Sequence, residues 1–365
     1  MNPIISQIGN LYSIRGNYED LSNKTIIITG SYGHIGSFIV EWLCKLFKNM
    51  NLLLIDNNYN GNIKNLNDAE WLAYKNNNKL VWLDISYDIR YYDLMERIFK
   101  INRPQYVFHQ ASLLTLDSKI DKKQSIDVNI GGLNNILDLS KKYGVKKVVF
   151  ASSASVYGDP SNIPTNEKHI RNINNTLYGA TKIANEHIAA SYADEENLKI
   201  VGLRYFNVFG ERQSTRNVYT QIVPKFINWF LDKKEITFTN DGSPTMDLIH
   251  GNDVGKYNVL AMVNKKCYRN KEFEGFINIG TGVQTSVLDL CYLIKEILES
   301  KGFDCLASNI TFPKIGKENF ENHNFVNRRQ SDTKLMNKFF GLYDFSLRDG
   351  LNRTIDCILK ERKLI

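Results

Sequence analysis

A phenol and an ammonium group stand four residues apart in the segment Tyr178-Gly-Ala-Thr-Lys182. Side chains at this spacing share one face of an α-helix, and the segment lies at the start of a helix-like stretch. A nearby cation favours the phenolate form of tyrosine, which can then act as a base near neutral pH. Taken alone, such a pair is more often a contact on the protein surface.

A serine-rich segment follows an apolar run earlier in the chain. The residues Val148-Val-Phe-Ala-Ser-Ser change abruptly from apolar to small and polar. This change is typical of a buried parallel strand that ends at an active-site edge, where ligands bind. A hydroxyl group from this segment could hydrogen-bond the substrate oxygen that Tyr178 deprotonates. In isolation, a serine-rich strand end is more often a turn.

Three glycines, Gly30, Gly33 and Gly36, separate a β-like run at 24–28 from a helix-like run that begins at Ser37. Glycines let the chain turn sharply and bring its backbone amides close to a diphosphate, and the helix N-terminus behind them favours negative charge. The spacing is GxxGxxG and not the GxGxxG of the general dinucleotide fingerprint, so a structural turn is the alternative.

Asp56 strengthens the dinucleotide interpretation. It ends the apolar run at 51–55 and lies 20 residues after Gly36. Dinucleotide-binding folds place a carboxylate here on the adenosine ribose hydroxyls. Asn57 and Asn58 follow, with no adjacent Lys or Arg to meet a ribose phosphate, so NAD is favoured over NADP. The alternative is an aspartate that caps a strand end.

Strand-like and helix-like segments alternate through the first 200 residues, which predicts a parallel sheet covered by helices on both faces. The expected strands are 24–29, 51–56, 80–83, 106–109, 147–151 and 199–203, and the expected helices include 91–101, 120–143 and 178–194. The Asn-rich stretches 57–67 and 172–175 are expected to be loops. We therefore predict an α/β fold in which a Rossmann-type doubly wound sheet is followed by a smaller C-terminal α/β substrate domain. The boundaries are an N-terminal extension at 1–22, the NAD-binding domain at 23–204 and mainly substrate domain at 205–365, with exchange of segments back to the first domain.

The composition, 43% hydrophobic and 23% charged residues of 365, is typical of soluble globular proteins. The apolar runs are too short to span a bilayer, and we expect no secretory signal in residues 1–23. Five scattered cysteines without a CxxC motif favour a reduced, cytoplasmic setting and argue against a structural metal site. The net charge of +7 is spread along the chain, which suits anionic small molecules rather than nucleic acid.

Together these residues resemble the extended short-chain dehydrogenase/reductase family, and within it the nucleotide-sugar epimerases and dehydratases. The resemblance covers nearly the whole chain from residue 24 to 359 and rests on motifs in a consistent order. These are TGSYGHIG (29–36), LLLIDNN (52–58), LDI (83–85), VFHQAS (107–112), VNIGG (128–132), SSASVYGDP (152–160), YGATK (178–182), LRYFNVFGERQ (203–213), SDTK (331–334) and LRDGLNRTID (347–356).

The resemblance implies a role for individual residues. Tyr178 would be the catalytic base, Lys182 would bind the nicotinamide ribose and lower the pKa of the tyrosine, and Ser153 would be the catalytic hydroxyl. The implied NAD-binding residues are Gly30, Gly33, His34, Ile35, Gly36, Asp56, Asn57, Asp84, Ile85, Ala111, Asn129, Tyr178, Lys182 and Tyr205, and for Asn129 a structural role is equally expected. The implied substrate-binding residues are Ser153, Asn207, Lys225, Arg328 and Arg329. The substrate would be a nucleotide-diphosphate sugar, most often a UDP-sugar. The implied homodimer would be built from helices 120–143 and 178–194, and polysaccharide synthesis would be the usual destination of the product.

The strand end also distinguishes between members of this family. Related 4,6-dehydratases carry Asp-Glu where this chain has Ala154 and Ser155, and decarboxylases usually carry Glu at Ser155. A 4-epimerase needs no such acid, because it oxidises C4, lets the keto sugar rotate and returns the hydride. We therefore favour a 4-epimerase, with a dehydratase or decarboxylase as the alternative. A non-catalytic NAD-binding sensor is a second alternative, although such proteins usually lose the tyrosine or the lysine.

The chain departs from the family at Met246, which replaces an arginine that clamps the diphosphate. Methionine cannot bind phosphate. Lys225, Arg328 or Arg329 could compensate, although Arg328 and Arg329 could also be a solvated pair. A charged Arg329 is unexpected in the pocket of a plain glucose/galactose enzyme, so the identity of the sugar stays open.

Overall fold

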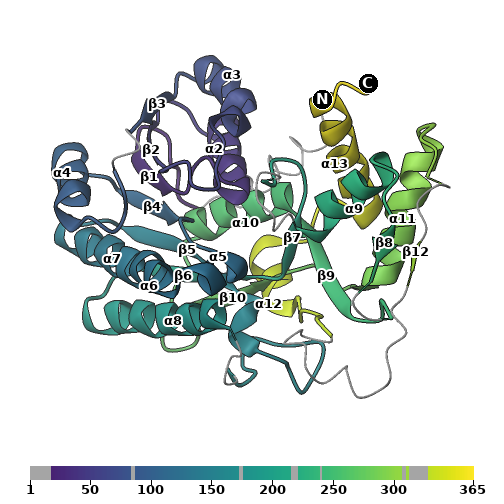
Figure 1. The fold of residues 1–365 in the computed structure, drawn as a ribbon. Helices are drawn as coiled ribbons and strands as arrows, with labels where there is room; N and C mark the ends of the chain where they lie inside the picture. The colour runs from purple at the N-terminus through teal and green to yellow at the C-terminus, as the bar shows by residue number, and fades with distance from the viewer. Residues whose placement is uncertain are drawn as a thin grey trace.

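The computed structural model of the chain describes residues 18–83, 87–171, 176–214, 221–238, 241–305, 310–311 and 328–365. Its centre is a seven-stranded sheet in the order β10-β6-β5-β4-β1-β2-β3, and every pairing is parallel (Figure 1). The strands are β1 (Thr25–Thr29), β2 (Asn51–Ile55), β3 (Lys79–Trp82), β4 (Tyr106–His109), β5 (Lys147–Ser153), β6 (Ile200–Tyr205) and β10 (Phe276–Ile279). This confirms the predicted doubly wound α/β fold.

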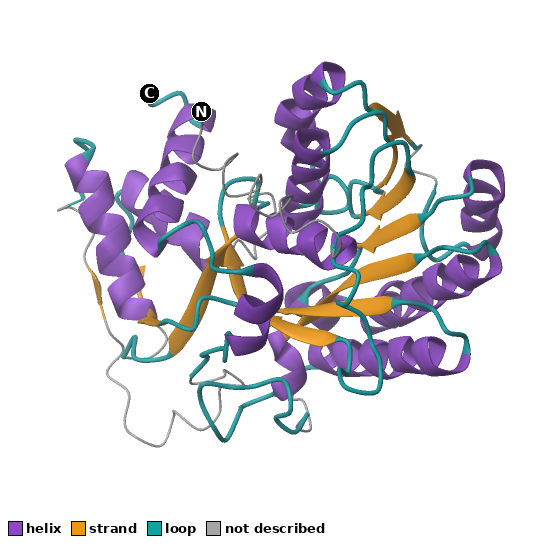
Figure 2. Ribbon diagram, turned by 180° about the vertical axis from the view of Figure 1, so that it is seen from behind, coloured by secondary structure: helices purple, strands orange, loops and turns teal. Residues whose placement is uncertain are grey.

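Helices cover both faces of this sheet, as the alternating strand residues require (Figure 2). Ile26 and Ile28 of β1 point into one hydrophobic core, and Ile27 between them points into the other. The first core is closed by α2 (His34–Leu46), α3 (Asn67–Lys75), α10 (Gly251–Val263) and α12 (Lys334–Phe340). The second is closed by α4 (Tyr92–Asn102), α7 (Gly132–Lys142) and α8 (Leu177–Glu195).

The predicted single helix over 120–143 is wrong. The segment contains the end of α5 (Thr115–Ile120), then α6 (Lys122–Ile126), a wide π turn (Asp127–Gly131) and α7. Asp121 breaks the helix because its backbone is extended, with φ −130°, and its side chain accepts a hydrogen bond from the Gln124 amide to begin α6. The predicted loop over 57–67 likewise includes a 3₁₀ helix (Ile63–Leu66) that leads into α3. The predicted loop 172–175 lies outside the described residues.

A smaller unit packs around a third hydrophobic core beside the large sheet. It holds a three-stranded sheet of β7 (Asn207–Phe209), β9 (Thr245–His250) and β11 (Gln284–Ser286), and a pair of short strands, β8 (Ile236–Thr237) and β12 (Ile310–Thr311). Its helices are α9 (Ile222–Leu231), α11 (Val287–Ser300) and α13 (Leu347–Glu361). Between these elements the chain returns to the first unit, because α10, β10 and α12 all pack on or in the large sheet.

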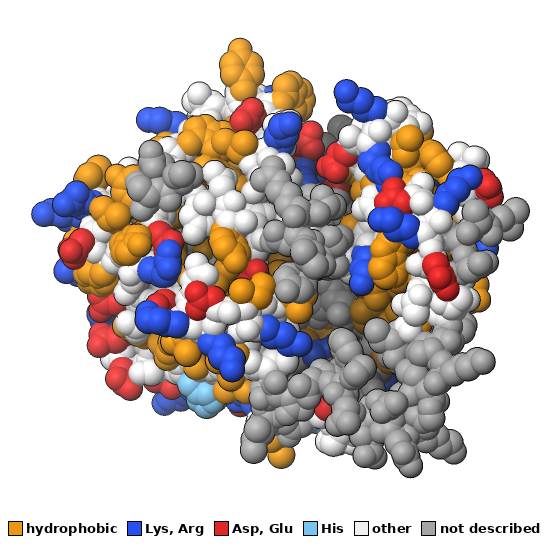
Figure 3. Space-filling model, viewed as in Figure 1, with side chains coloured by type: hydrophobic (Ala, Val, Ile, Leu, Met, Phe, Trp, Pro, Cys, Tyr) orange, Lys and Arg blue, Asp and Glu red, His pale blue; other side chains and the backbone are white. Residues whose placement is uncertain are grey.

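The view in Figure 3 shows Lys and Arg side chains scattered among Asp and Glu over this face of the molecule. Among the helices within the described ranges of the chain, none is both long and apolar enough to cross a bilayer.

The buried carboxylate of Asp247 joins the two units. It accepts hydrogen bonds from the amide (2.7 Å) and hydroxyl (2.8 Å) of Thr281, which follows β10. It also accepts them from the amide of Gly282 (3.0 Å) and from the amide (2.8 Å) and hydroxyl (2.5 Å) of Ser331. One side chain of β9 therefore holds both the loop that follows β10 and the segment that precedes α12.

We expect Asp247→Asn to lower the free energy of unfolding by roughly 2–4 kcal/mol, because hydrogen bonds to a charged group contribute more than neutral ones. Urea unfolding followed by circular dichroism would measure the change. Asp349→Asn is the matched control, because the Asp349 carboxylate also accepts a serine hydroxyl, that of Ser346, but is exposed to solvent. Equal losses in the two variants would contradict this interpretation of Asp247.

Candidate active site

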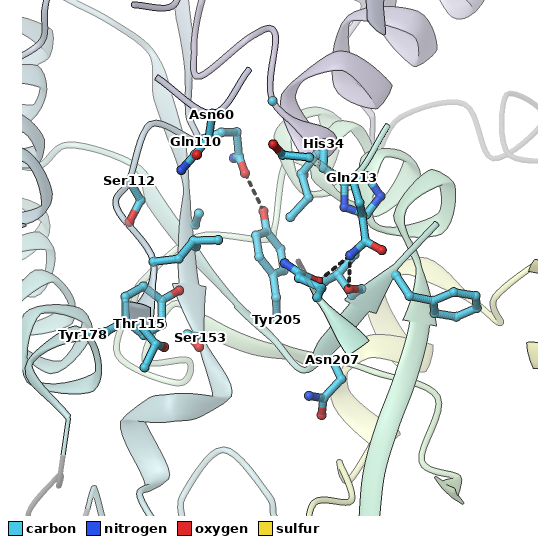
Figure 4. A pocket seen from close by; sticks show the side chains of 18 of the residues that line it. His34, Asn60, Gln110, Ser112, Thr115, Ser153, Tyr178, Tyr205, Asn207 and Gln213 are labelled. Carbon is cyan, nitrogen blue, oxygen red and sulfur yellow. Dashed lines mark hydrogen bonds between the residues drawn. The ribbon is translucent and has the colours of Figure 1, made fainter. Parts of the chain in front are cut away.

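A cavity of about 520 Å³ lies where the carboxyl ends of β1, β5 and β6 face the smaller unit. Tyr178 and Ser153 lie on one side of it, Asn207 and Gln213 on the other, and Tyr205 between them (Figure 4). The residues predicted from the sequence that line this cavity are Gly30, Gly33, His34, Ile35, Gly36, Ser153, Tyr178, Lys182, Tyr205 and Asn207. The fold therefore brings the glycine loop and the tyrosine–lysine pair to one place.

A second cavity of about 130 Å³ adjoins the first, since Gly30, Gly33 and Gln110 line both. Asp56, Asn57 and Ala111 line the second cavity, which reaches the end of β2. The two cavities together extend from Asp56 past the glycine loop to Tyr178. Asp84 and Ile85, two of the predicted NAD-binding residues, lie outside the described residues.

The glycine loop is shaped for the close approach of a diphosphate. Gly30 has φ +66°, and a Cβ there would lie 2.7 Å from the amide nitrogen of Ala111. A Cβ on Gly36 would lie 2.0 Å from the Gly30 carbonyl oxygen. Helix α2 begins at His34, and no side chain among the described residues caps its N-terminus. Its first amide groups are thus suited to an anion, which fits the pyrophosphate of a dinucleotide.

The Asp56 carboxylate fits the adenosine ribose of the same dinucleotide. Its two oxygens accept hydrogen bonds from the amides of Tyr32 and Asn58, both at 2.9 Å. Burial raises the pKa of Asp56, and these hydrogen bonds oppose the shift. Asp56 lines the smaller cavity, where a carboxylate is a suitable acceptor for ribose hydroxyls. Asn57 instead donates a hydrogen bond to Asp88 (3.2 Å).

Helix α8 presents Tyr178 and Lys182 to the cavity from its first turns. Thr176 caps the helix by accepting a hydrogen bond from the Gly179 amide. The Lys182 ammonium lies 5.5 Å from the centre of the Tyr178 ring and donates a hydrogen bond to the Ala151 carbonyl (2.9 Å). Burial lowers the pKa of Lys182 to about 7.

Ser153 completes this group from the end of β5. Burial raises the pKa of Tyr178, while a hydrogen bond with Ser153 and the charge of Arg329 act to lower it. The Ser153 hydroxyl also lies 3.1 Å from that of Ser155. A substrate hydroxyl placed against Ser153 and Tyr178 would meet a hydrogen-bond partner and a base at once.

Two residues that the sequence analysis did not single out hold Tyr205 in the cavity. Its hydroxyl lies 3.0 Å from the Gln110 side-chain oxygen and 2.9 Å from that of Asn258 (Figure 4 shows the first contact). Gln110 directly follows β4, so its place at the carboxyl edge could have been inferred. Asn258 lies in α10, far away in the sequence, and carries no local signal.

Asn129 is fully buried and joins two segments behind the site. Its side chain hydrogen-bonds the amide (2.8 Å) and carbonyl (3.0 Å) of Leu113 and the Thr181 hydroxyl (3.1 Å). These bonds tie the loop after β4 to α8.

The predicted substrate-binding residues differ in how deeply they are buried. The Asn207 side-chain oxygen is buried and has no hydrogen-bond partner within the described part of the chain. Lys225 and Arg328 are exposed, and the Lys225 ammonium lies 4.5 Å from the centre of the Trp229 ring. Arg329 is partly buried, and its charge acts on both Tyr178 and Asp159; burial lowers the pKa of Arg329 to about 10. Met246, which the resemblance places where an arginine is expected, lines the cavity.

Comparisons with known proteins show the family of this chain. Residues 26–280 match the model of the NAD dependent epimerase/dehydratase family. A putative UDP-glucose 4-epimerase of Methanocaldococcus jannaschii is 32% identical over 280 residues, which are 76% of this chain and 83% of the relative. A UDP-N-acetyl-alpha-D-glucosaminuronate decarboxylase of Bacillus cytotoxicus is 28% identical over 343 residues, which are 91% and 97% of the two chains.

The solved structure of UDP-glucose 4-epimerase with UDP-glucose from Thermotoga maritima is 30% identical, has a TM-score of 0.77 and covers 93% of this chain and 99% of its own. The family match, the relatives and the fold confirm the resemblance drawn from the motifs. The chain belongs to the NAD-dependent epimerase/dehydratase family, and NAD is its cofactor.

Proposed function

We propose that this enzyme interconverts the two C4 epimers of a UDP-sugar through a transient 4-keto sugar. The observation that carries the proposal is the convergence of Ser153, Tyr178 and Lys182 on one cavity whose neighbouring strand end offers no carboxylate. Dehydration would need an acid and a second base at that strand end, and Ala154 and Ser155 supply neither. Relatives that carry the name UDP-glucose 4-epimerase support the same reaction.

In this mechanism Ser153 hydrogen-bonds the C4 hydroxyl of the sugar, and Tyr178 removes its proton. Lys182 stabilises the phenolate and binds the nicotinamide ribose. NAD, when bound, supplies reversible hydride acceptance. Tyr178 then returns the proton to the C4 oxygen after the keto sugar has turned its other face, so the residues end the cycle as they began it.

We propose that the remaining predicted residues hold the two nucleotides. Gly30, Gly33 and Gly36, with the amides of His34 and Ile35, would contact the NAD pyrophosphate, and Asp56 the adenosine ribose. Asn57 and Ala111 would line this binding site, with Tyr205 near the nicotinamide.

On the substrate side, Asn207 would donate to the sugar-nucleotide pyrophosphate. Of the three cations expected to compensate for Met246, Arg329 is the one whose charge acts on Tyr178, so we place it near the sugar and not at the diphosphate. Lys225 and Arg328 would reach the diphosphate only at the rim of the cavity.

A homodimer through the α5–α7 region and α8, and a product used in polysaccharide synthesis, complete the proposal. Ile120 and Ile126 are large apolar side chains exposed on α5 and α6, which is consistent with a contact there.

The reaction is tested by incubating the NAD-loaded enzyme with UDP-, TDP-, GDP- and CDP-sugars and analysing the products by mass spectrometry and NMR. We expect a UDP-sugar to give an isomer of equal mass, and the same equilibrium mixture from either epimer. A product lighter by one water or by carbon dioxide would overturn the epimerase proposal in favour of a dehydratase or decarboxylase.

Tyr178→Phe removes the proton acceptor and keeps the ring. We expect kcat to fall by roughly 100- to 10,000-fold, the usual contribution of general acid–base catalysis, with unfolding little changed. Tyr192→Phe is the control on the same helix, because its hydroxyl donates a hydrogen bond to the Asn134 side chain at an exposed position and should not matter for turnover. Normal turnover in Tyr178→Phe would exclude this mechanism.

Asp56→Asn removes the charge at the ribose end. We expect the Kd for NAD to rise about ten- to hundredfold, because hydrogen bonds to a charged group contribute about 1.5–3 kcal/mol. Discrimination against NADP should relax at the same time, since the carboxylate no longer repels the extra phosphate. Titration calorimetry on protein freed of cofactor would measure both constants, and a wild-type preference for NADP would refute the role of Asp56.

A further inference from the structure

A buried ion pair lies directly behind the active site and takes no direct part in the proposed reaction. Arg204 of β6 is 0% exposed and Glu186 of α8 is 1% exposed. Two hydrogen bonds of 2.8 Å join the Arg204 Nε and Nη2 atoms to the two carboxylate oxygens. Desolvation of two charges offsets most of their attraction, so a buried pair of this kind is weak evidence for a stabilising role.

The Glu186 carboxylate has no free acceptor position. Besides the two bonds from Arg204, its Oε1 accepts the Ser152 hydroxyl (2.6 Å) and its Oε2 accepts the Arg171 Nε–H (2.8 Å). Four donors therefore fill the four positions of the carboxylate. Burial acts against ionisation, but Arg204 and Ser152 hold the pKa of Glu186 below its usual range, so it stays negative at neutral pH.

Glu186 lies one helical turn after Lys182, on the same face of α8. With its hydrogen-bond positions filled, the carboxylate can act on Lys182 only through space. It is the charge that opposes the lowering of the Lys182 pKa by burial. The other titratable or charged groups around Lys182 and this pair include Tyr178 on α8, His109 on β4, Tyr157 after β5, Arg171 and Glu167 in the segment before α8, and Glu274 before β10.

The position of the carboxylate is fixed from several directions. Arg204 Nη1 donates to the Tyr157 hydroxyl (2.7 Å), which donates to the Asn278 side-chain oxygen (2.6 Å). Asn278 donates in turn to the carbonyl of Thr165 (2.9 Å), whose backbone pairs with Ser331. The network thus runs from the catalytic helix to the segment that carries Arg329.

We propose that Glu186 is a positioning residue for the reaction, and that its buried carboxylate, held by Arg204, Ser152 and Arg171, keeps Lys182 in the ammonium form beside Tyr178. The inference rests on the proposed function for the role of the Tyr178–Lys182 pair. It does not depend on which sugar is the substrate.

The test measures the protonation of Lys182 directly in the NAD-loaded enzyme. Lysines labelled with ¹³C at Cε are titrated by NMR, and the Lys182 signal is assigned by its absence in Lys182→Arg. Glu186→Gln should lower the midpoint of Lys182 by about one pH unit or more, because a buried opposite charge is lost and two arginines remain. Since Lys182 acts as a cation, the alkaline limb of the pH profile of kcat should move to lower pH by the same amount.

Arg171→Gln should shift the Lys182 midpoint in the direction opposite to Glu186→Gln. The Arg171 side chain is 25% exposed, so the variant should fold, and loss of this cation should raise the Lys182 midpoint. Asp194→Asn is the matched control: Asp194 also sits on α8 and binds an arginine, Arg269, through both oxygens, but 58% of its side chain is exposed. It should leave the Lys182 midpoint unchanged.

A Glu186→Gln protein that is less stable but keeps the Lys182 midpoint would show a structural role only and overturn the proposal. If Glu186→Gln does not fold, Arg171→Gln decides alone, and an unchanged or lowered midpoint in that variant overturns the proposal. If no UDP-sugar is converted by the wild type, the proposed function fails, while the NMR titration still tests Glu186.

Discussion

The burial of the Lys182 ammonium between α8 and β5 is the constraint on which the active site depends. An ammonium removed from water loses much of its hydration and tends to give up its proton, whereas the mechanism that we propose needs it charged to favour the phenolate of Tyr178. The structure answers this with one neutral partner, the Ala151 carbonyl, and one charge at a distance, Glu186. In our proposal, the charge state of Lys182 therefore depends on Glu186, a group that takes no direct part in the reaction.

Buried charged groups also join the two units of the molecule. Asp247 accepts five hydrogen bonds from the loops beyond β10 and around Ser331, and Asp253 accepts the amides of Asp344 and Phe345 (2.9 and 3.1 Å). Buried carboxylates are tolerated when several donors surround them, and they then hold backbone segments in one arrangement. The cavity between the units has a defined shape for this reason, although the chain crosses between the units several times.

The chemistry of the cavity wall is asymmetric. The end of the cavity at Tyr178 and Tyr205 is rich in hydrogen-bonding groups at fixed distances, whereas its β9 wall carries Met246. The charge of Arg329 acts on Tyr178. The relatives carry the names of epimerases, dehydratases and decarboxylases alike, so we expect the few side chains at the end of β5 to decide between these reactions. Hydroxyl groups and a methyl group at 153–155 leave redox chemistry at C4 as the reaction that this wall supports best.

Local patterns in the sequence determined the alternating α/β order, the glycine turn before α2, the carboxylate at the end of β2 and the shared helical face of Tyr178 and Lys182. Each of these follows from geometry within one or two adjacent elements, which is why neighbouring residues suffice to predict it. The break at Asp121 escaped the pattern, because the apolar residues keep a helical period on both sides of it. Only the tertiary structure decided that Gln110 and Asn258 hold Tyr205, that Arg204 reaches Glu186, and that Lys225 and Arg328 lie exposed while Arg329 acts on Tyr178. These contacts join residues from separate elements. They form only when the helices pack on the sheet, so the sequence pattern of any one element cannot predict them.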